Sequence, residues 1–341
     1  MRRALSLVFA LGVACSDDGG GASGTGGGGA PSGGGAGPGG GGGAGATGPS
    51  GAGGAGADEV GGAGGLAPTL CEGFEPLSGE QTFTLDWDGA ARSYFARVPS
   101  SYDATSPMPV VFVFHGFTQT AEQIETVSKM TPAAEARGYL VVYAQGLGTS
   151  WNAGGCCGTS SSFDVDDVGF VGAMIDDLST KLCLDPKRIH ACGFSNGGML
   201  SHRLGCEAAD RIASFGAVSG TMAVTDCTPS RPIAVMHQHG TGDFVVPYDG
   251  FFLGADTVPE TIDGWVARNG CTTETVTFDE GDATCVTHGG YMAGADVALC
   301  TLEGGGHQWP GGESAGPGGV VNMDLAGSEA LLDFFDAHPL P

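Results

Sequence analysis

The chain has 341 residues, and its 13 basic and 38 acidic residues give a formal net charge of −25 at pH 7. Such an acidic balance argues against a nucleic-acid-binding protein or one that docks on anionic membranes, and it suits a neutral polymer or ester substrate. The length is sufficient for one α/β domain of barrel or hydrolase size with additional segments.

Residues 1–15 predict an export signal. The basic start Met1-Arg2-Arg3 is followed by an apolar run that ends before Cys15 and is too short to span a membrane. The ending Leu11-Gly12-Val13-Ala14-Cys15 resembles a bacterial lipobox, although Gly12 stands where leucine is expected. Two outcomes stay open: lipidation of Cys15, which would tether the protein to the cell surface, and ordinary secretion.

Residues 16–67 predict a flexible linker between this signal and the folded domain. More than half of the stretch 16–65 is glycine, with alanine, serine, threonine and proline in the gaps. Such a composition cannot bury a core, and the absence of a strict Gly-X-Y period excludes collagen. We therefore place the folded domain at residues 68–341.

Strand-like and helix-like segments alternate through this domain. Two segments in which the side-chain pattern repeats every second residue predict a hairpin at the start of the domain. Helices are predicted wherever apolar residues recur at helical spacing. Alternation of this kind predicts an α/β fold, with a mostly parallel sheet and helices on both faces. The hairpin is expected at 82–87 and 93–98, further strands at 110–114, 139–143, 188–192, 212–218, 233–236 and 297–302, and helices at 121–136, 167–182, 198–204 and 328–335.

The segment Gly193-Phe194-Ser195-Asn196-Gly197 fits G-x-S-x-G, the nucleophile elbow of α/β-hydrolases. A serine hydroxyl needs an adjacent base and a sharp strand-to-helix turn that exposes it. Such a turn crowds the backbone, and Gly193 and Gly197 are small enough to relieve the crowding. The predicted strand before Ser195 and the predicted helix after it supply the required context.

Asp243 follows a predicted strand, in the loop His239-Gly240-Thr241-Gly242-Asp243. A carboxylate beyond the carboxyl end of a strand lies where α/β sheets carry their chemistry, and it could hold the tautomer of a catalytic imidazole. The alternative is an ordinary turn aspartate. The order Ser195, Asp243 and then a histidine is the one that α/β-hydrolases use.

Three histidines follow Asp243, and His307 is the one we expect to act as the base. It lies in the glycine-rich loop Glu303 to Gly311, directly after a predicted strand, so the loop could bring the imidazole to the serine. His338 is close to the C-terminus, and His288 lies in a polar stretch bounded by cysteines.

An oxyanion hole needs one backbone N–H from the residue after the nucleophile and another from the loop after an earlier strand. Asn196 is the first donor. The buried strand that ends at His115-Gly116 predicts Phe117, or its neighbour Thr118, as the second.

The pair His237 and His239 raises the alternative of a metal site, because both imidazoles would lie on one face of a strand near Asp243. The acid, however, comes four residues after the second histidine, where a metallo-hydrolase pattern would place it two residues after. No Cys-x-x-Cys or His-Glu-x-x-His motif is present. We therefore expect neither a metal nor a cofactor.

Of the eleven cysteines, ten lie behind the predicted export signal, and an even set in an exported protein predicts disulfides. We expect one bridge between Cys206 and Cys227 and one within the set Cys271, Cys285 and Cys300. The sequence neighbours Cys156 and Cys157 are not expected to pair with each other, and Cys192 is expected to be a buried free thiol.

From about Cys71 to its end the chain resembles the secreted esterases grouped as feruloyl esterases, acetylxylan esterases and poly(3-hydroxybutyrate) depolymerase-like proteins. The resemblance implies an α/β-hydrolase fold with the triad Ser195, Asp243 and His307. Phe117 stands where the family often has cysteine, and two of the matching stretches look more like the feruloyl-esterase branch. The matches are His115 to Gln119, Trp151 to Gly158, Asp166 to Phe170, Gly193 to Met199, His239 to Asp243 with Val246-Pro247-Tyr248, and Gly304 to Gly311.

These observations predict an extracellular serine esterase that acts on feruloyl or acetyl esters of plant xylan. Trp151 and Trp309 could stack against a phenolic acid or a sugar ring, or could instead pack their loops. The main alternative is a polyhydroxybutyrate depolymerase, whose substrate would be a polyester. An alternative of another class is a surface binding protein that kept the fold without catalysis.

Overall fold

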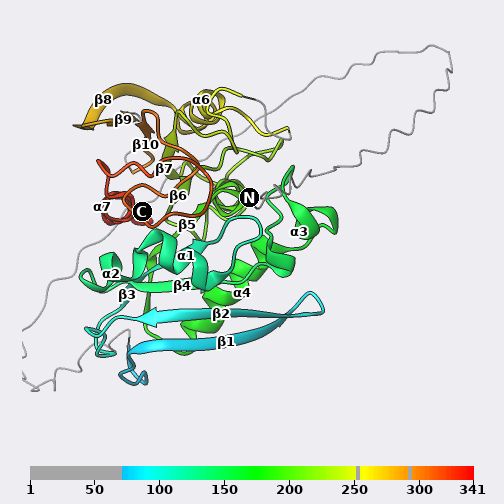
Figure 1. Cartoon of the computed structure of the whole chain (residues 1–341). Helices are drawn as coiled ribbons and strands as arrows, with labels where there is room; N and C mark the ends of the chain where they lie inside the picture. The colour runs from blue at the N-terminus through cyan, green and yellow to red at the C-terminus, as the bar shows by residue number, and fades with distance from the viewer. Residues whose placement is uncertain (1–70, 251–253, 291–293) are drawn as a thin grey trace, which may run out of the picture. The chain divides into compact units, whose positions relative to one another are not determined.

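A ten-stranded sheet forms the centre of the folded domain (Figure 1). The structure, a computed structural model, describes residues 71–250, 254–290 and 294–341. The strands lie in the order β1-β2-β4-β3-β5-β6-β7-β10-β9-β8. Their bounds are β1 Gly79–Trp87, β2 Ala90–Val98, β3 Met108–Phe114, β4 Leu140–Ala144, β5 Leu184–Phe194, β6 Ser214–Val218, β7 Ala234–Gly240, β8 Cys271–Glu280, β9 Ala283–Gly290 and β10 Val297–Leu302.

The middle of the sheet, from β4 to β10, is parallel, whereas both of its edges are antiparallel. Strands β3, β4, β6 and β7 are buried along their whole length, as expected for parallel strands with helices on both faces. The carboxyl ends of the parallel strands therefore meet at one edge, where the loops that follow them can form a site.

Helices cover both faces of the sheet, and the sheet divides the core into two layers. In β3, Val110, Phe112 and Phe114 point to one layer, and Val111 and Val113 point to the other. Helices α4 (Asp167–Ser179), α5 (Asn196–Glu207) and α6 (Val258–Asn269) pack on the first face. Helices α1 (Ala121–Ser128), α2 (Met130–Glu135) and α7 (Gly327–Ala337) pack on the second, while η1 (Leu147–Thr149) and α3 (Gly158–Ser162) are short turns in a connecting segment.

The predicted α/β-hydrolase architecture is confirmed, including the N-terminal hairpin and every predicted central strand. The predicted helix at 121–136 is divided into α1 and α2 at Lys129, which adopts a left-handed conformation (φ 54°). Pro132 explains the division, because inside a continuous helix its ring would clash with the carbonyl of Ser128.

Helix α6 and the hairpin of β8 and β9 were not predicted. The start of α6 does carry a readable signal, since Thr257 and Glu260 form a capping box and proline occupies the first turn. Strand β8 is exposed along most of its length, so its sequence lacks a buried face that would give an alternating pattern.

Four disulfides are present among the described residues: Cys71–Cys183, Cys156–Cys157, Cys206–Cys227 and Cys285–Cys300. The predicted bridge between Cys206 and Cys227 is confirmed, and so is a bridge within the set Cys271, Cys285 and Cys300, since Cys285 pairs with Cys300. Cys192 is a buried free thiol, as expected. The expectation that Cys156 and Cys157 would not pair was wrong. The peptide bond that joins them is cis, which brings their Cα atoms to 3.1 Å.

The predicted export signal, Cys15 and the glycine-rich linker lie outside the described residues. Within the part of the chain that is described, no helix has the length and apolar character that crossing a membrane requires.

Candidate active site

Ser195 occupies the turn between β5 and α5, at the carboxyl edge of the sheet. Its backbone has φ 55° and ψ −120°, a conformation that non-glycine residues rarely adopt. The Ser195 N–H donates to the carbonyl of Val218 in the neighbouring strand at 2.8 Å. A strained residue held by a strand–turn–helix unit is the geometry of a nucleophile elbow.

Gly193 and Gly197 allow this turn to close. A Cβ atom on Gly193 would overlap the carbonyl of Gly197, and a Cβ atom on Gly197 would overlap the carbonyl of Phe114. Both obstacles are backbone atoms, which cannot rotate away as a side chain can. The steric role predicted for the two glycines is therefore confirmed.

Asp243 and His307 meet beside this turn, although 64 positions separate them in the sequence. Asp243 follows β7, His307 follows β10, and these two strands are parallel neighbours. Nδ1 of His307 lies 2.7 Å from Oδ2 of Asp243. A carboxylate only accepts hydrogen bonds, so Nδ1 carries the proton and Nε2 presents a free lone pair.

The Asp243 carboxylate is buried but well supplied with donors. Its Oδ1 accepts the backbone N–H groups of Val245 and Val246, each at 2.8 Å. Burial alone would raise the pKa of Asp243, but the hydrogen bonds from His239 and His307 outweigh it and hold this pKa well below the usual range of a carboxyl group. Asp243 is therefore ionised at neutral pH and can stabilise a protonated His307.

Ser195 and His307 are linked through Phe194. The ring of Phe194, the residue directly before Ser195, lies 4.7 Å from the imidazole of His307, centroid to centroid. Among the hydrogen bonds of the described residues, none joins the Ser195 hydroxyl to His307. Catalytic hydrogen bonds are often long in the free enzyme and shorten when substrate is bound.

The N–H groups of Phe117 and Asn196 are the candidate oxyanion donors. Thr118, the alternative to Phe117, donates its N–H to the carbonyl of Thr149 at 2.8 Å and is therefore occupied. In the described part of the chain, no hydrogen bond uses the N–H of Phe117. The N–H of Asn196 belongs to the first turn of α5, where helix N–H groups lack intrahelical partners.

His115 shapes the loop that carries Phe117. Its Nε2 accepts the N–H of Gly146 at 3.0 Å, so its Nδ1–H donates to the carbonyl of Gly116 at 2.8 Å. Burial lowers the pKa of His115 to about 4, against a weaker opposing effect of the Gly116 carbonyl. His115 is therefore a neutral structural residue and not a competing base.

Trp151 connects the two halves of the candidate oxyanion hole. Its indole N–H donates to the carbonyl of His115 at 2.9 Å. Its backbone N–H and carbonyl bond to the side-chain amide of Asn196, at 2.7 and 3.0 Å. Trp151 has no solvent-exposed surface, so the structure places it behind the site as a brace and not where it could stack on substrate.

Trp309 also follows the packing alternative and not the stacking one. It is fully buried in the core layer under α7, and its indole N–H donates to the hydroxyl of Ser328 at 3.1 Å. The sequence could not separate the two alternatives for these tryptophans, because a loop position alone does not determine on which side of the loop the side chain packs.

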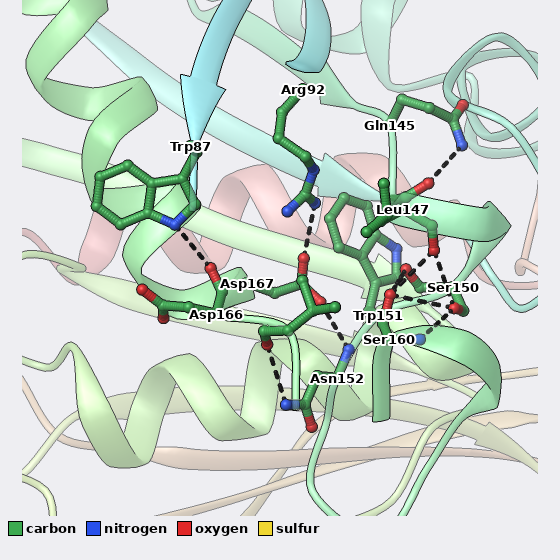
Figure 2. A network of polar contacts seen from close by, with 12 residues as sticks. Trp87, Arg92, Gln145, Leu147, Ser150, Trp151, Asn152, Ser160, Asp166 and Asp167 are labelled. Carbon is green, nitrogen blue, oxygen red and sulfur yellow. Dashed lines mark hydrogen bonds and ion pairs between the residues drawn. The ribbon is translucent and has the colours of Figure 1, made fainter. Parts of the chain in front are cut away.

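A buried ion pair, Arg92 with Asp167, supports the loop that carries Trp151 and Asn152 (Figure 2). The guanidinium of Arg92 donates to Oδ1 of Asp167 at 2.7 Å, and the N–H of Asn152 donates to Oδ2 at 2.7 Å. Arg92 also lies 4.0 Å from the ring centroid of Phe170. The matching stretches around Trp151 and Asp167 are thus joined in one network, to which Arg92 contributes from 75 positions earlier in the chain.

The other two histidines after Asp243 are engaged elsewhere. His338 bonds to Asp296 and to the carbonyl of Phe334, and His288 lies on the β8–β9 hairpin, 3.8 Å from Glu274. No group of three or more potential metal ligands occurs within residues 71–250, 254–290 and 294–341.

A hollow of about 510 Å³ lies between α4 and the C-terminal end of α5, whereas Ser195 precedes the N-terminal end of α5. It is lined by residues of α4 and by Trp87, Glu207 and Arg211, and it includes no candidate nucleophile. The candidate site lies elsewhere, at the edge of the sheet where the loops after β3, β5, β7 and β10 begin.

We predict that Arg92→Met lowers the free energy of unfolding by about 3–5 kcal/mol, because the buried carboxylate of Asp167 would lose its charged partner. Arg211→Met is the matched control: it breaks the exposed ion pair with Asp176 and should cost no more than about 1 kcal/mol. Urea unfolding measures both. Equal losses in the two variants would contradict the proposed role of the network.

Comparisons with known proteins relate this chain to esterases. Residues 164–265 match the Phospholipase/Carboxylesterase family. Feruloyl esterase B of Piromyces equi is 34% identical over 236 residues, which cover 63% of this chain but only 42% of that protein. Feruloyl esterase D of Neurospora crassa is 27% identical over 257 residues, covering 71% of this chain and 80% of that protein.

The fold is also found in an acetyl xylan esterase from Aspergillus awamori, with a TM-score of 0.57 and 13% identity over 76% of this chain and 99% of that one. At this identity the likeness concerns the fold alone. The resemblance expected from the sequence motifs is confirmed: the chain has an α/β-hydrolase fold and is similar in sequence to feruloyl esterases.

Proposed function

We propose that the protein is a serine carboxylic-ester hydrolase that acts on feruloyl or acetyl esters of plant xylan. The observation that carries the proposal is the hydrogen bond between His307 and Asp243 beside the strained turn of Ser195. The kinship with feruloyl esterases supports the substrate class. No cofactor is required, because the three side chains and two backbone N–H groups supply every role in the reaction.

In the first half of the reaction, the Ser195 hydroxyl oxygen attacks the ester carbonyl carbon while Nε2 of His307 takes the hydroxyl proton. The carbonyl oxygen becomes an oxyanion that accepts hydrogen bonds from the N–H groups of Asn196 and Phe117. Asp243 holds Nδ1–H and stabilises the imidazolium. When the C–O bond breaks, His307 gives its proton to the leaving alcohol and an acyl-serine remains.

In the second half, water attacks the acyl carbon and His307 accepts a proton from it. The second tetrahedral intermediate collapses, the bond to Ser195 breaks, and the serine recovers its proton from His307. The products are a carboxylic acid and the free serine, so atoms and charges balance without any further reactant.

Exposed apolar side chains surround the site and favour an ester with an apolar or aromatic acyl group. Phe117 carries the second oxyanion donor, and Phe244 and Val245 directly follow Asp243. Val320 belongs to the loop that bonds to Gly306, next to His307. Such a rim could receive the ring of a phenolic acid, a role that the buried tryptophans cannot perform as they are packed.

The same rim suits a polyester, so a polyhydroxyalkanoate depolymerase is the second candidate. Assays of methyl ferulate, acetylated xylan and polyhydroxybutyrate film, run side by side, separate the two functions. Release of ferulate or acetate without clearing of the film supports the xylan esterase, and clearing of the film alone supports the depolymerase.

We also propose that the protein is exported and works outside the cytoplasm. Four disulfides support this, because such bonds persist in oxidising compartments. We further propose that a lipid on Cys15 tethers the exported protein to the cell surface. Mass spectrometry of the mature N-terminus distinguishes a lipidated Cys15 from a cleaved, unmodified chain.

We predict that Ser195→Ala reduces kcat on methyl ferulate by roughly four to six orders of magnitude, because the variant lacks the nucleophile. Circular dichroism should show an unchanged fold. Hydrolysis at the wild-type rate would refute the assignment of Ser195 and favour a different catalytic centre.

Phe117→Pro removes the N–H that we assign to the oxyanion hole, and kcat should fall by about 10²–10³-fold. Phe117→Ala is the matched control, since it keeps the N–H and loses only the ring. If both variants retain the same kcat, Phe117 is not an oxyanion donor.

Phe244→Ala should raise KM for methyl ferulate several-fold and leave KM for p-nitrophenyl acetate almost unchanged, because only the larger acyl group reaches the rim. Val276→Ala, which alters an exposed apolar residue on the distant edge strand β8, serves as the control. An equal effect on both substrates would show that Phe244 does not select the acyl group.

A further inference from the structure

A row of three buried imidazoles leads from α6 to the acid of the candidate triad. The row begins at Trp265 of α6, whose indole contacts His202 of α5. His202 contacts His237 of β7, and His237 contacts His239 on the same face of that strand. The successive nitrogen–nitrogen distances are 3.0, 3.3 and 3.0 Å. All four side chains are completely buried.

The two ends of the row determine the direction of every hydrogen bond in it. The indole N–H of Trp265 can only donate, so Nδ1 of His202 accepts and its proton is on Nε2. Nε2–H of His202 then donates to Nδ1 of His237, and Nε2–H of His237 donates to Nδ1 of His239. At the far end, Nε2–H of His239 donates to the carbonyl of Val246, which can only accept.

The row ends on the turn that holds the triad acid. Nε2 of His239 lies 2.9 Å from the Val246 carbonyl and 3.4 Å from Oδ2 of Asp243. The N–H of Val246 in turn donates to Oδ1 of Asp243. His239 thus fixes both the backbone of the Asp243–Val246 turn and one side of the carboxylate, while His307 bonds to the same Oδ2 atom.

His202 and His237, the two inner imidazoles of the row, are neutral. Burial lowers the pKa of His202 to about 3, and burial together with the neighbouring imidazoles lowers the pKa of His237 well below its ordinary value. The charged groups nearby are Arg268, 5.4 Å from the Trp265 ring, and the Asp243 carboxylate, 3.4 Å from Nε2 of His239. In the described part of the chain, no nitrogen of the row is left without a partner.

We propose that Trp265, His202, His237 and His239 form a hydrogen-bond relay of fixed direction that positions Asp243 for His307. The four are positioning residues, since none reaches the substrate. Every ring presents an N–H toward Asp243, so the bonds polarise one another in the same direction and strengthen the last donor. The relay rests on the proposed function, because it acts through Asp243, but its tautomers can be measured without any substrate.

Nitrogen NMR of the full chain labelled with ¹⁵N-histidine tests the relay directly. Each of the three imidazoles should carry its proton on Nε2 and none on Nδ1 at neutral pH, and His202 and His237 should keep this tautomer at every pH at which the protein stays folded. A Nδ1–H tautomer at any of the three, or titration of His202 or His237 near neutral pH, would overturn the proposal. Ester hydrolysis plays no part in this result, so it stands apart from the test of the proposed function.

Variants at His237 test what the relay does. His237→Leu interrupts it and should lower kcat about tenfold with KM unchanged, since Asp243 loses one of its supports. His237→Gln can still accept and donate, and it should recover most of kcat. Phe215→Leu, which changes a buried ring that packs on His202 without a hydrogen bond, should leave kcat unchanged.

The low-field proton resonance of His307 Nδ1–H separates positioning from a merely structural effect. It should move upfield in folded His237→Leu and return toward the wild-type position in His237→Gln, whereas Phe215→Leu should not shift it. If His237→Leu folds with the wild-type resonance and kcat, the relay does not position Asp243.

Discussion

The hydrogen bond between His307 and Asp243 is the contact on which the rest of the site depends. It joins two loops that leave adjacent parallel strands, β7 and β10, whose register pairs Gly240 with Leu302. A parallel sheet brings such loops to the same edge whatever their separation in the chain. Once the carboxylate is fixed there, only the Nδ1–H tautomer of His307 fits, which leaves Nε2 as the nitrogen that can accept a proton.

The buried aromatic and charged residues near the site position its groups and do not bind substrate themselves. Trp151 connects the His115 loop to Asn196, through its indole and its backbone respectively, so one residue braces the elements that carry both candidate oxyanion donors. Arg92 and Asp167 support the same loop from the interior. A site that stabilises developing charge works only if its donors are in place before the reaction, and these buried contacts provide that preorganisation.

Much of this arrangement could be predicted from the sequence. The strand–helix alternation, the elbow around Ser195, and the positions of Asp243 and His307 after predicted strands have local signals. The burial of Trp151 and Trp309 and the role of His237 and His239 do not. A histidine pair on a strand looks the same in a chain whether it binds metal, packs in a core or relays hydrogen bonds. The difference lies in partners such as His202 and Trp265, which only the fold brings together.

The most direct measurement of the central claim is mass spectrometry of the protein after reaction with a fluorophosphonate. If Ser195 is activated by His307 and Asp243, one adduct should form on the peptide that contains Ser195, and His307→Ala should abolish it. Esterase activity that persists with no adduct on Ser195, or an adduct on another residue, would contradict the account.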